Sequence, residues 1–227
     1  MLYGLNNGVR IEATPNAQAV CQCCNSELIP KCGNINVWHW SHKFKVHCDD
    51  WYEPETQWHK GWKNEFPKDC QEVVFKDELT GEKHVADVYL PKGLVLEFQN
   101  SNISSEEIQQ RENFYKKMIW VINGDKFYQN LIHSDHGNFL WKHRKKCWLV
   151  AKMPIFISFT NAKIETSCFR SNLRETEAID YSNSLILVKE FTELSIYKKG
   201  QIVSYEYNFI GQKVNKYNFI KKYFSYL

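Results

Sequence analysis

Residues 83–99, KHVADVYL-PKG-LVLEFQ, predict two β-strands joined by a tight turn. A short connection that contains Pro and Gly favours an antiparallel hairpin. Because side chains alternate between the two faces of a strand, Glu97 and Gln99 point the same way on the second strand. A three-residue turn centred on Lys92 places Asp87 directly across from Glu97, on that same face. The hairpin therefore gathers two carboxylates and one amide on otherwise apolar strands.

This pair of carboxylates predicts a metal site. Directly opposed side chains have Cβ atoms about 5 Å apart, so two carboxylates in these positions repel unless a cation lies between them. Mg²⁺ and Mn²⁺ are hard divalent cations that prefer carboxylate oxygens. We therefore expect Asp87 and Glu97 to hold Mg²⁺ or Mn²⁺, with Gln99 pointing into the same site.

A helix is predicted ahead of the hairpin. Residues 55–66 are bounded by a proline on each side, as the ends of a helix often are. At 3.6 residues per turn, Glu55, His59 and Lys63 form one polar stripe beside an apolar stripe of aromatic residues. The polar stripe therefore borders the predicted core and is a candidate part of the same site.

A second helix and a buried strand are predicted behind the hairpin. Ser104 and Glu107 have the spacing of a capping box, and Arg111 and Tyr115 project together from the helix that follows. The apolar run at 118–122 indicates a strand that is buried on both faces after a crossover helix. The order helix, three strands, helix, strand is that of the αβββαβ core of PD-(D/E)XK nucleases.

The first fifty residues predict a second metal site, of a different kind. Cys21 and Cys24 place two thiolates one tight turn apart, and His39 and His42 supply two imidazoles further along, close to the spacing of a two-Cys, two-His zinc site. A site with four protein ligands is closed, so we expect structural Zn²⁺. Other residues compete for the same positions, namely Cys23, Cys32, His47 and Cys48. An alternative is a His-Asn-His type nuclease module with His39 or His42 as general base, although no helix with a second ligand histidine follows.

Composition limits the class of protein. The 227 residues are 43% hydrophobic and 24% charged, which excludes a disordered or collagen-like chain. No apolar run approaches the roughly 18 residues of a membrane-spanning helix, and the start lacks a signal-peptide pattern. We expect a cytoplasmic protein without membrane contact, whose cysteines are reduced and available to a metal.

Changes of pattern along the chain predict an α+β protein with three parts. We expect a zinc-binding N-terminal module at 1–50, a PD-(D/E)XK nuclease-like core at 51–125 and a mixed C-terminal substrate-binding or accessory region at 126–227. Within the last part, strands are predicted at 154–159, 184–188 and 194–198.

A nucleic-acid surface has to be local, because the net charge of +3 is ordinary for this size. Residues 141–148, WKHRKKCW, place basic side chains between two rings that can stack on exposed bases. The basic residues are Lys142, Arg144, Lys145 and Lys146. A second candidate is 213–226, where lysines alternate with aromatic residues, although this stretch also predicts an amphipathic terminal helix.

The combined pattern resembles the competence protein CoiA-like family of the PD-(D/E)XK nuclease superfamily. The resemblance covers roughly residues 10 to 125. Its matching pieces, in order, are Cys21-x2-Cys24, the stretch from Trp38 to His42, Glu55-Thr56-x2-His59-x3-Lys63, Ala86-Asp87-Val88, Glu97-x-Gln99, Arg111-x3-Tyr115 and the stretch from Met118 to Trp120.

The resemblance implies metal-dependent cleavage of phosphodiester bonds in DNA, linked to competence, recombination or phage defence. It implies that Asp87 and Glu97 hold the catalytic metal, that Gln99 stands where the motif usually has Lys, and that Glu55 contributes from the first helix. As a hypothesis, Lys63 supplies the missing positive charge.

Further roles follow for the neighbouring residues. His59 orients a phosphate or relays a proton, and Arg111 with Tyr115 contacts the phosphate backbone or braces the metal ligands. The alternative function is a non-enzymatic, zinc-stabilised DNA-binding accessory factor in recombination of imported DNA. A third class, a metal-dependent protein-interaction module, leaves the basic stretch at 141–148 unexplained. The expected partners are DNA, single- or double-stranded, and recombination or defence proteins, while RNA as substrate and the oligomeric state stay open.

Overall fold

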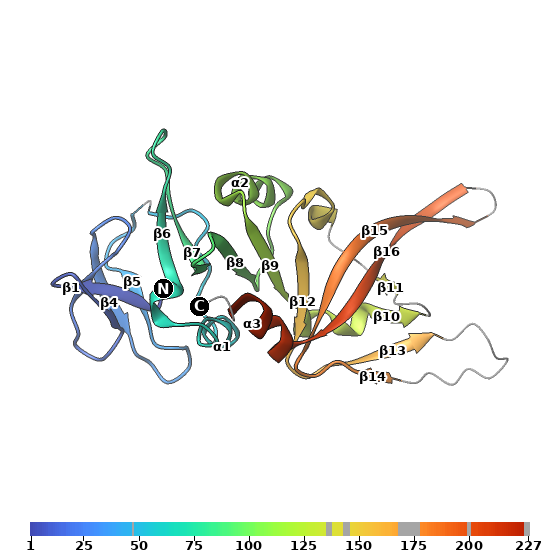
Figure 1. Cartoon of the computed structure of the whole chain (residues 1–227), viewed down its shortest axis with the longest axis horizontal. Helices are drawn as coiled ribbons and strands as arrows, with labels where there is room; N and C mark the ends of the chain where they lie inside the picture. The colour runs from blue at the N-terminus through green and yellow to red at the C-terminus, as the bar shows by residue number, and fades with distance from the viewer. Residues whose placement is uncertain (47, 135–137, 143–145, 168–177, 199–200, 225–227) are drawn as a thin grey trace. The chain divides into compact units, whose positions relative to one another are not determined.

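The structure is a computed structural model of the chain, and it describes residues 1–46, 48–134, 138–142, 146–167, 178–198 and 201–224. It is a mixed α/β fold dominated by β-sheets (Figure 1). The chain divides into two compact units, here called unit 1, from Met1 to Ser101, and unit 2, which begins at Asn102.

Unit 1 begins with a small antiparallel sheet in the strand order β2-β1-β3-β4-β5. Trp40 is fully buried in its core, beside Leu28. A Cβ on Gly4 would lie 2.8 Å from the Cβ of Ala19, so the close approach of β1 and β3 requires glycine. Such a small core gains stability from a bound metal. The strands are β1 (Tyr3–Asn6), β2 (Val9–Glu12), β3 (Ala19–Val20), β4 (Glu27–Lys31) and β5 (His39–His42).

A single helix, α1 (Gln57–Lys63), follows this sheet. The Thr56 side chain caps its first turn, so the helix is shorter than the sequence predicted and Glu55 lies before the cap. Phe66 lies beyond the helix end but is still buried, with its ring stacked on Phe98 at a centroid distance of 6.5 Å.

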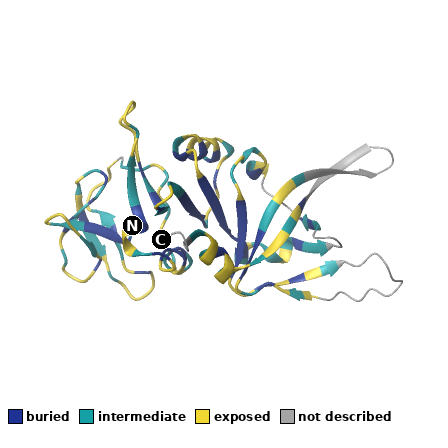
Figure 2. Cartoon of the chain, in the orientation of Figure 1, coloured by how far each residue is buried: buried dark blue, intermediate teal, exposed yellow. Residues whose placement is uncertain are grey.

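The second sheet of unit 1 contains the predicted hairpin. The register pairs Val88 with Leu96 and Leu90 with Leu94, so the turn is centred on Lys92, as the sequence predicted. Gly93 has a positive φ of 75°, which explains the glycine at this turn. The second strand is buried from Val95 onward (Figure 2). The elements, in the sheet order β6-β7-β8, are β6 (Gln71–Lys76), β7 (Lys83–Leu90) and β8 (Leu94–Gln99), with the short 3₁₀ turn η1 (Lys68–Cys70) before them.

Unit 2 opens with α2 (Ser105–Tyr115) and β9 (Met118–Asn123). The Ser104 side chain accepts the Glu107 N–H at 3.0 Å, so the helix begins where the predicted capping serine stands. β9 is buried along its whole length, which agrees with its continuous apolar sequence.

The rest of unit 2 is mostly sheet, in the order β14-β13-β10-β11-β16-β15-β12-β9. The sequence predicted two strands at 184–188 and 194–198, but the structure joins them in one long strand with a register shift between Val188 and Glu190. The strands are β10 (Leu131–Ser134), β11 (Asn138–Trp141), β12 (Ile155–Phe159), β13 (Lys163–Ser167), β14 (Ala178–Asp180), β15 (Ser184–Lys198) and β16 (Gln201–Asn215). Short 3₁₀ turns are η2 (Gly124–Lys126), η3 (Tyr128–Asn130) and η5 (Lys146–Val150).

The chain ends in α3 (Lys216–Phe224). Phe219 is buried and its ring meets that of Phe156 at 4.8 Å, whereas Lys221 and Lys222 are exposed. The stretch is therefore an amphipathic helix that packs on unit 2. Within the described part of the chain, no helix combines the length and apolar composition needed to cross a membrane.

Candidate functional site

Three thiols and one imidazole gather beside the first sheet of unit 1. Cys21 and Cys24 lie in the turn between β3 and β4, His42 ends β5, and Cys48 follows it. Each offers one ligand atom, and these atoms lie within 4.8 Å of one another. The Cys21 and Cys48 sulfurs are 3.6 Å apart, and Cys24 Sγ lies 3.4 Å from His42 Nε2. Ligands of a tetrahedral zinc ion lie about 3.5–3.8 Å apart at normal bond lengths, so the cluster fits structural zinc.

The fourth ligand of this cluster is Cys48, one of the competing residues, and His39 lies outside it. His39 and His42 stand three residues apart on a strand, so their side chains leave opposite faces. His39 Nδ1 instead lies 2.7 Å from Val37 O. The hydrogen bond with Cys48 lowers the pKa of Cys21 to about 4, which favours the thiolate that binds metal. Of the other competitors, Cys23 and Cys32 are not in the cluster, and His47 lies outside the described residues.

The segment after Cys48 connects the Cys/His cluster to the hairpin. Asp49 Oδ1 lies 2.8 Å from His84 Nδ1, and Asp49 Oδ2 accepts the Val85 N–H at 2.8 Å. The other ring nitrogen of His84 lies 2.8 Å from Glu82. Burial opposes the charged imidazole, but hydrogen bonds to the two carboxylates outweigh it and raise the pKa of His84. This contact fixes the segment to β7 a few residues before Asp87.

Asp87 and Glu97 face each other across the β7–β8 hairpin. The Phe98 N–H donates to Asp87 Oδ2 at 2.9 Å, and the Asp87 N–H donates to Glu97 Oε1 at 3.3 Å. Each carboxylate therefore accepts a backbone N–H from the opposite strand. Glu97 is buried, whereas the Asp87 side chain is 21% exposed, so the pair has one buried and one solvent-accessible member.

Lys63 of α1 reaches three carboxylates at once. Its Nζ lies 2.9 Å from Glu55, 3.0 Å from Glu72 and 3.2 Å from Asp87. Burial opposes the charged amine, but the carboxylates outweigh it and raise the pKa of Lys63 well above its ordinary value. Burial likewise opposes the charged form of Glu72, and Lys63 outweighs it, so that the pKa of Glu72 falls to about 2. Lys63 is therefore a cation within a buried acidic cluster.

Glu72 adopts an unusual backbone conformation at the start of β6. Its φ is +46°, in the left-handed region that a buried non-glycine residue occupies at a cost of roughly 1–3 kcal/mol. Its carboxylate accepts the backbone N–H groups of Leu2 at 2.7 Å and Tyr3 at 3.1 Å. These bonds and Lys63 hold the side chain in place, so the strained residue lies within the acidic cluster.

A further carboxylate, that of Glu53, organises the end of β8. It accepts hydrogen bonds from the Gln99 amide and from the Ser101 hydroxyl, the latter at 2.6 Å. His59 Nε2 donates to Phe98 O at 2.8 Å and lies 3.2 Å from Glu53. Burial opposes the imidazolium, but Glu53 outweighs it and raises the pKa of His59. Glu53 therefore links the imidazole of α1 with the amide of β8.

One oxygen of Glu55 stands out in the cluster. Glu55 Oε2 binds Lys63, but Oε1 is buried and lacks a hydrogen-bond partner among the described residues. A buried carboxylate oxygen without a partner costs about 1–3 kcal/mol or more. The cluster thus holds four carboxylates, three of them in contact with the one Lys63 ammonium, and a divalent cation would supply the missing partner. The four are Glu55, Glu72, Asp87 and Glu97.

Two predicted substrate contacts lie in unit 2 and are buried there. Arg111 is 4% exposed, donates to Glu107 and lies over the Trp120 ring at 5.9 Å. Tyr115 is 8% exposed on the same helix. Both side chains are therefore packed into unit 2 instead of being presented to solvent.

In the basic stretch at 141–148, the two tryptophan rings are buried, whereas the sequence predicted that they would be exposed. Trp141 is buried and stacks on Phe127 at 4.4 Å, and Trp148 is buried with its edge against Trp120 at 5.4 Å. The expectation that these rings stack on bases is wrong, because both belong to the core of unit 2. Lys142 and Lys146 are exposed, while Arg144 and Lys145 lie outside the described residues.

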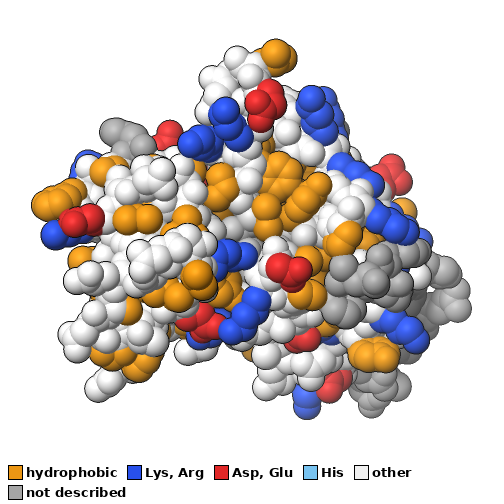
Figure 3. Space-filling view, turned by 60° about the vertical axis from the view of Figure 1, so that its left-hand side comes forward, with side chains coloured by type: hydrophobic (Ala, Val, Ile, Leu, Met, Phe, Trp, Pro, Cys, Tyr) orange, Lys and Arg blue, Asp and Glu red, His pale blue; other side chains and the backbone are white. Residues whose placement is uncertain are grey.

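The charged surface carries no single dominant patch on the face shown in Figure 3. There the Lys and Arg side chains of the described residues are spread among acidic and apolar ones. This distribution agrees with the small net charge of +3.

The sequence did not predict two of the carboxylates described above. These are Glu72, which belongs to the acidic cluster, and Glu53, which lies beside it at the end of β8. Glu72 is the second residue of β6 and directly precedes the apolar run at 73–75, and an acid in that position was an available signal. Glu53 lies in a segment without secondary structure, between the zinc cluster and α1, where no periodicity indicates its partners.

Comparison with known families identifies both parts of the pattern. Residues 7–50 match the family described as "Competence protein CoiA, N-terminal domain", and residues 79–163 match "Competence protein CoiA, nuclease-like domain". Searches of curated proteins and of solved structures give no match. The two family matches together span more than half of the 227 residues, with all four residues of the Cys/His cluster in one and the carboxylate hairpin in the other. The chain belongs to the CoiA-like competence protein family.

Proposed function

We propose that the chain is a metal-dependent nuclease that hydrolyses phosphodiester bonds in DNA, with a PD-(D/E)XK-type active site around Lys63. The observation that carries this proposal is the unbalanced charge of the buried cluster. Three carboxylates contact the one Lys63 ammonium, a fourth, that of Glu97, accepts the Asp87 N–H, and Glu55 Oε1 has no partner among the described residues. A hard divalent cation would balance this charge and bind that oxygen.

Asp87, Glu97 and Glu55 are the residues that would hold Mg²⁺ or Mn²⁺. Asp87 is the partly exposed member, so it is the side chain that meets both the cation and a substrate phosphate. A bound cation would polarise the scissile phosphate and lower the pKa of a bound water, which supplies the attacking hydroxide.

The other residues of the cluster position these ligands. Lys63 directs its amine to three carboxylates, so its role is to hold Glu55 and Asp87 in place while offsetting their repulsion. Glu53 accepts the Gln99 amide N–H, which leaves the amide oxygen as the free end of that side chain. His59, whose pKa Glu53 raises, is the group that would orient a phosphate or give up a proton.

Two other features support a nucleic-acid substrate. The family match over residues 79–163 is to a nuclease-like domain and includes Asp87, Glu97 and Gln99. Lys142 and Lys146 are exposed and are proposed, with Arg144 and Lys145, as contacts to the phosphate backbone. Structural zinc at the Cys21 cluster would hold the segment that carries Glu53 and Glu55.

The test is cleavage of labelled single- and double-stranded DNA by protein whose zinc content has been measured. Wild type is compared with Asp87→Asn and Glu97→Gln, which keep side-chain shape but remove the charge, with Mg²⁺, Mn²⁺ or no added metal. Glu78→Gln is the matched control, because Glu78 is exposed on the turn between β6 and β7 and lies outside the cluster. We expect metal-dependent cleavage that falls by about a hundredfold or more in the two site variants and persists in the control.

Two results would contradict the proposal. Cleavage that is unchanged in Asp87→Asn would show that the activity resides elsewhere. Intact DNA in every reaction, with binding retained, would favour the non-enzymatic accessory factor.

A further inference from the structure

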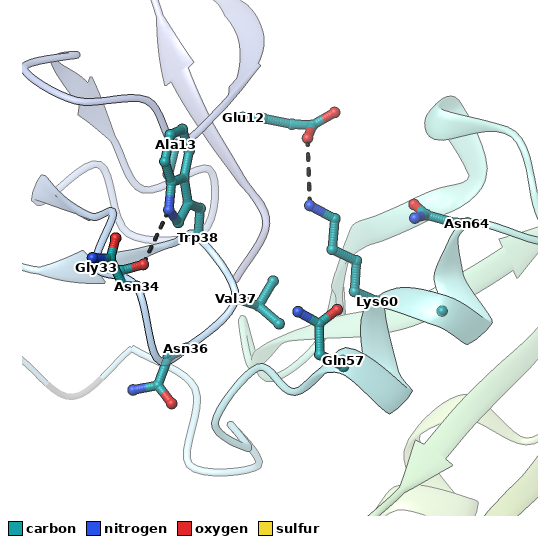
Figure 4. Close-up of a pocket in the computed structure, with 11 residues that line it drawn as sticks. Glu12, Ala13, Gly33, Asn34, Asn36, Val37, Trp38, Gln57, Lys60 and Asn64 are labelled. Atoms are coloured by element: carbon teal, nitrogen blue, oxygen red, sulfur yellow. Dashed lines mark hydrogen bonds and ion pairs between the residues drawn. The ribbon is translucent and has the colours of Figure 1, made fainter. Parts of the chain in front are cut away.

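A cavity of about 530 Å³ lies within unit 1, beside α1 (Figure 4). One wall is the loop before β5, with Trp38, and the other is α1. The volume falls in the range of roughly 300–1,000 Å³ that is usual for small-molecule sites. The residues that line it are Glu12, Ala13, Gly33, Asn34, Asn36, Val37, Trp38, Gln57, Lys60, Gly61 and Asn64.

The lining is neutral and rich in carboxamides. Four side-chain amides reach it, and none of them has a side-chain hydrogen bond within the described part of the chain, although amides are strong donors and acceptors. They are those of Asn34, Asn36, Gln57 and Asn64. Trp38 is 45% exposed, and its indole N–H donates to Gly33 O at 3.2 Å, which fixes the ring beside these amides.

This chemistry selects among classes of ligand. A phosphate or another anion is disfavoured, because Lys60 is the one cationic residue in the lining and it lies 4.0 Å from Glu12. An apolar ligand is disfavoured by the amides, and a metal by the single carboxylate. A flat, neutral heterocycle with a hydrogen-bonding edge fits best, because an aromatic ring stacks on its face and Asn or Gln pairs with its edge.

We propose that this cavity binds one unpaired nucleobase of the nucleic acid on which the chain acts. The base would stack on Trp38 and bond its edge to the amides of Gln57 and Asn64. A base within a duplex has both faces stacked and its pairing edge occupied, so it does not enter such a cavity. The preferred ligand is therefore single-stranded.

The position of the cavity supports a link with the acidic cluster. On a helix of 3.6 residues per turn, Gln57, Lys60 and Asn64 share one arc, and His59 and Lys63 lie on the neighbouring arc, with Lys63 about 60° from Lys60. The cavity and the acidic cluster therefore border adjoining arcs of the same helix. The identification of the ligand as a nucleobase rests on the proposed function, but its test measures binding and needs no cleavage.

The test compares binding of two labelled oligonucleotides of equal length and charge, one with bases and one abasic, at constant salt and without added Mg²⁺ or Mn²⁺. The proteins are wild type, Trp38→Ala, Trp38→Phe and the double variant Gln57→Ala with Asn64→Ala. Phe44→Ala is the control, since Phe44 is a 68% exposed ring that does not line the cavity. The zinc content of each variant verifies that it is folded. If Trp38→Ala does not fold, Trp38→Phe still tests the position, because it keeps an aromatic ring there.

We expect wild type to prefer the oligonucleotide with bases by about 5- to 150-fold, the range of one stacked base. Trp38→Ala and the double variant lose this preference, while Trp38→Phe retains most of it and Phe44→Ala all of it. In protein labelled with 5-fluorotryptophan, the Trp38 resonance, assigned by its absence in Trp38→Phe, shifts only with the base-containing strand.

Equal binding of the two strands by wild type, a preference that survives in Trp38→Ala, or no binding of either strand would overturn the inference. Base-dependent binding without cleavage would overturn the proposed nuclease activity alone. Cleavage without base-dependent binding would overturn the cavity proposal alone.

Discussion

Replacing Lys63 by Met removes the one ammonium from the buried acidic cluster of unit 1. The side chain of Lys63 is 5% exposed, and its amine lies within 3.2 Å of three carboxylates. Methionine has a similar length but no charge, so the variant leaves these carboxylates buried without their cation. We expect the folded protein to lose stability because the remaining charges repel and lack a partner.

The magnitude follows from two independent considerations. Removing one partner of a buried ion pair typically costs about 3–5 kcal/mol. Separately, the pKa of Glu72 falls from its ordinary 4.5 to about 2, against the effect of burial and because of Lys63 first, with the N-terminal amine and the N–H groups of Leu2 and Tyr3 contributing. A depression of this size corresponds to roughly 3 kcal/mol of stabilisation of the ionised form. We therefore predict that Lys63→Met lowers the free energy of unfolding by about 3–5 kcal/mol at pH 7.

The pH dependence has a definite sign. A carboxylate whose pKa is depressed in the folded state stabilises the protein above its unfolded pKa, and this contribution is lost as pH falls through the folded pKa. For Glu72 the contribution is complete above pH 4.5 and disappears as pH approaches 2. In Lys63→Met the folded pKa of Glu72 rises, so the difference between wild type and variant shrinks as pH falls from 4.5 towards 2.

Urea titrations of both proteins at a series of pH values measure this difference. Lys60→Met is the matched control, since Lys60 lies on the same helix in a partly exposed pair with Glu12 at 4.0 Å. Exposed pairs contribute about 0–1 kcal/mol, so the control should unfold nearly as wild type does. A cost below about 1 kcal/mol for Lys63→Met, or a cost that does not change with pH, would refute the reasoning.

Three further outcomes are expected. Metal analysis should find one zinc per chain in wild type and in His39→Ala but little in Cys48→Ser, whose melting temperature should also fall because it lacks one ligand. Equal zinc in all three proteins would contradict the assigned ligand set. Glu53→Gln should lower the NMR titration midpoint of the His59 ring, because Glu53 is what raises its pKa against burial, and an unmoved midpoint would show that the pair is not coupled. Gly124→Ala should destabilise unit 2 by about 1–3 kcal/mol in thermal unfolding, because a Cβ there would lie 2.7 Å from Ile157; an unchanged melting temperature would contradict this packing.

The local parts of the fold could be predicted from the sequence because neighbouring residues decide them. The hairpin register follows from a turn of three residues, and the start of α2 follows from Ser104 and Glu107. The face-to-face placement of Asp87 and Glu97 follows from that register, with no information from distant parts of the chain.

The remaining parts depend on contacts between distant segments. Cys48 approaches Cys21 across 27 residues of chain, and no spacing rule specifies which cysteine arrives there. Glu72 joins Lys63 through a strained backbone that strand periodicity does not predict. In the same way, the ring of Trp141 is buried because unit 2 needs it in its core, although its basic neighbours suggested a surface.

The most direct test of the carboxylate site is a Mn²⁺ titration followed by electron paramagnetic resonance, on zinc-loaded wild type and on Asp87→Asn. We predict that wild type binds one Mn²⁺ per chain, and that Asp87→Asn loses this binding while keeping its zinc and its fold. Stoichiometric Mn²⁺ binding that survives in Asp87→Asn, or no Mn²⁺ binding by wild type, would contradict a catalytic metal at Asp87 and Glu97.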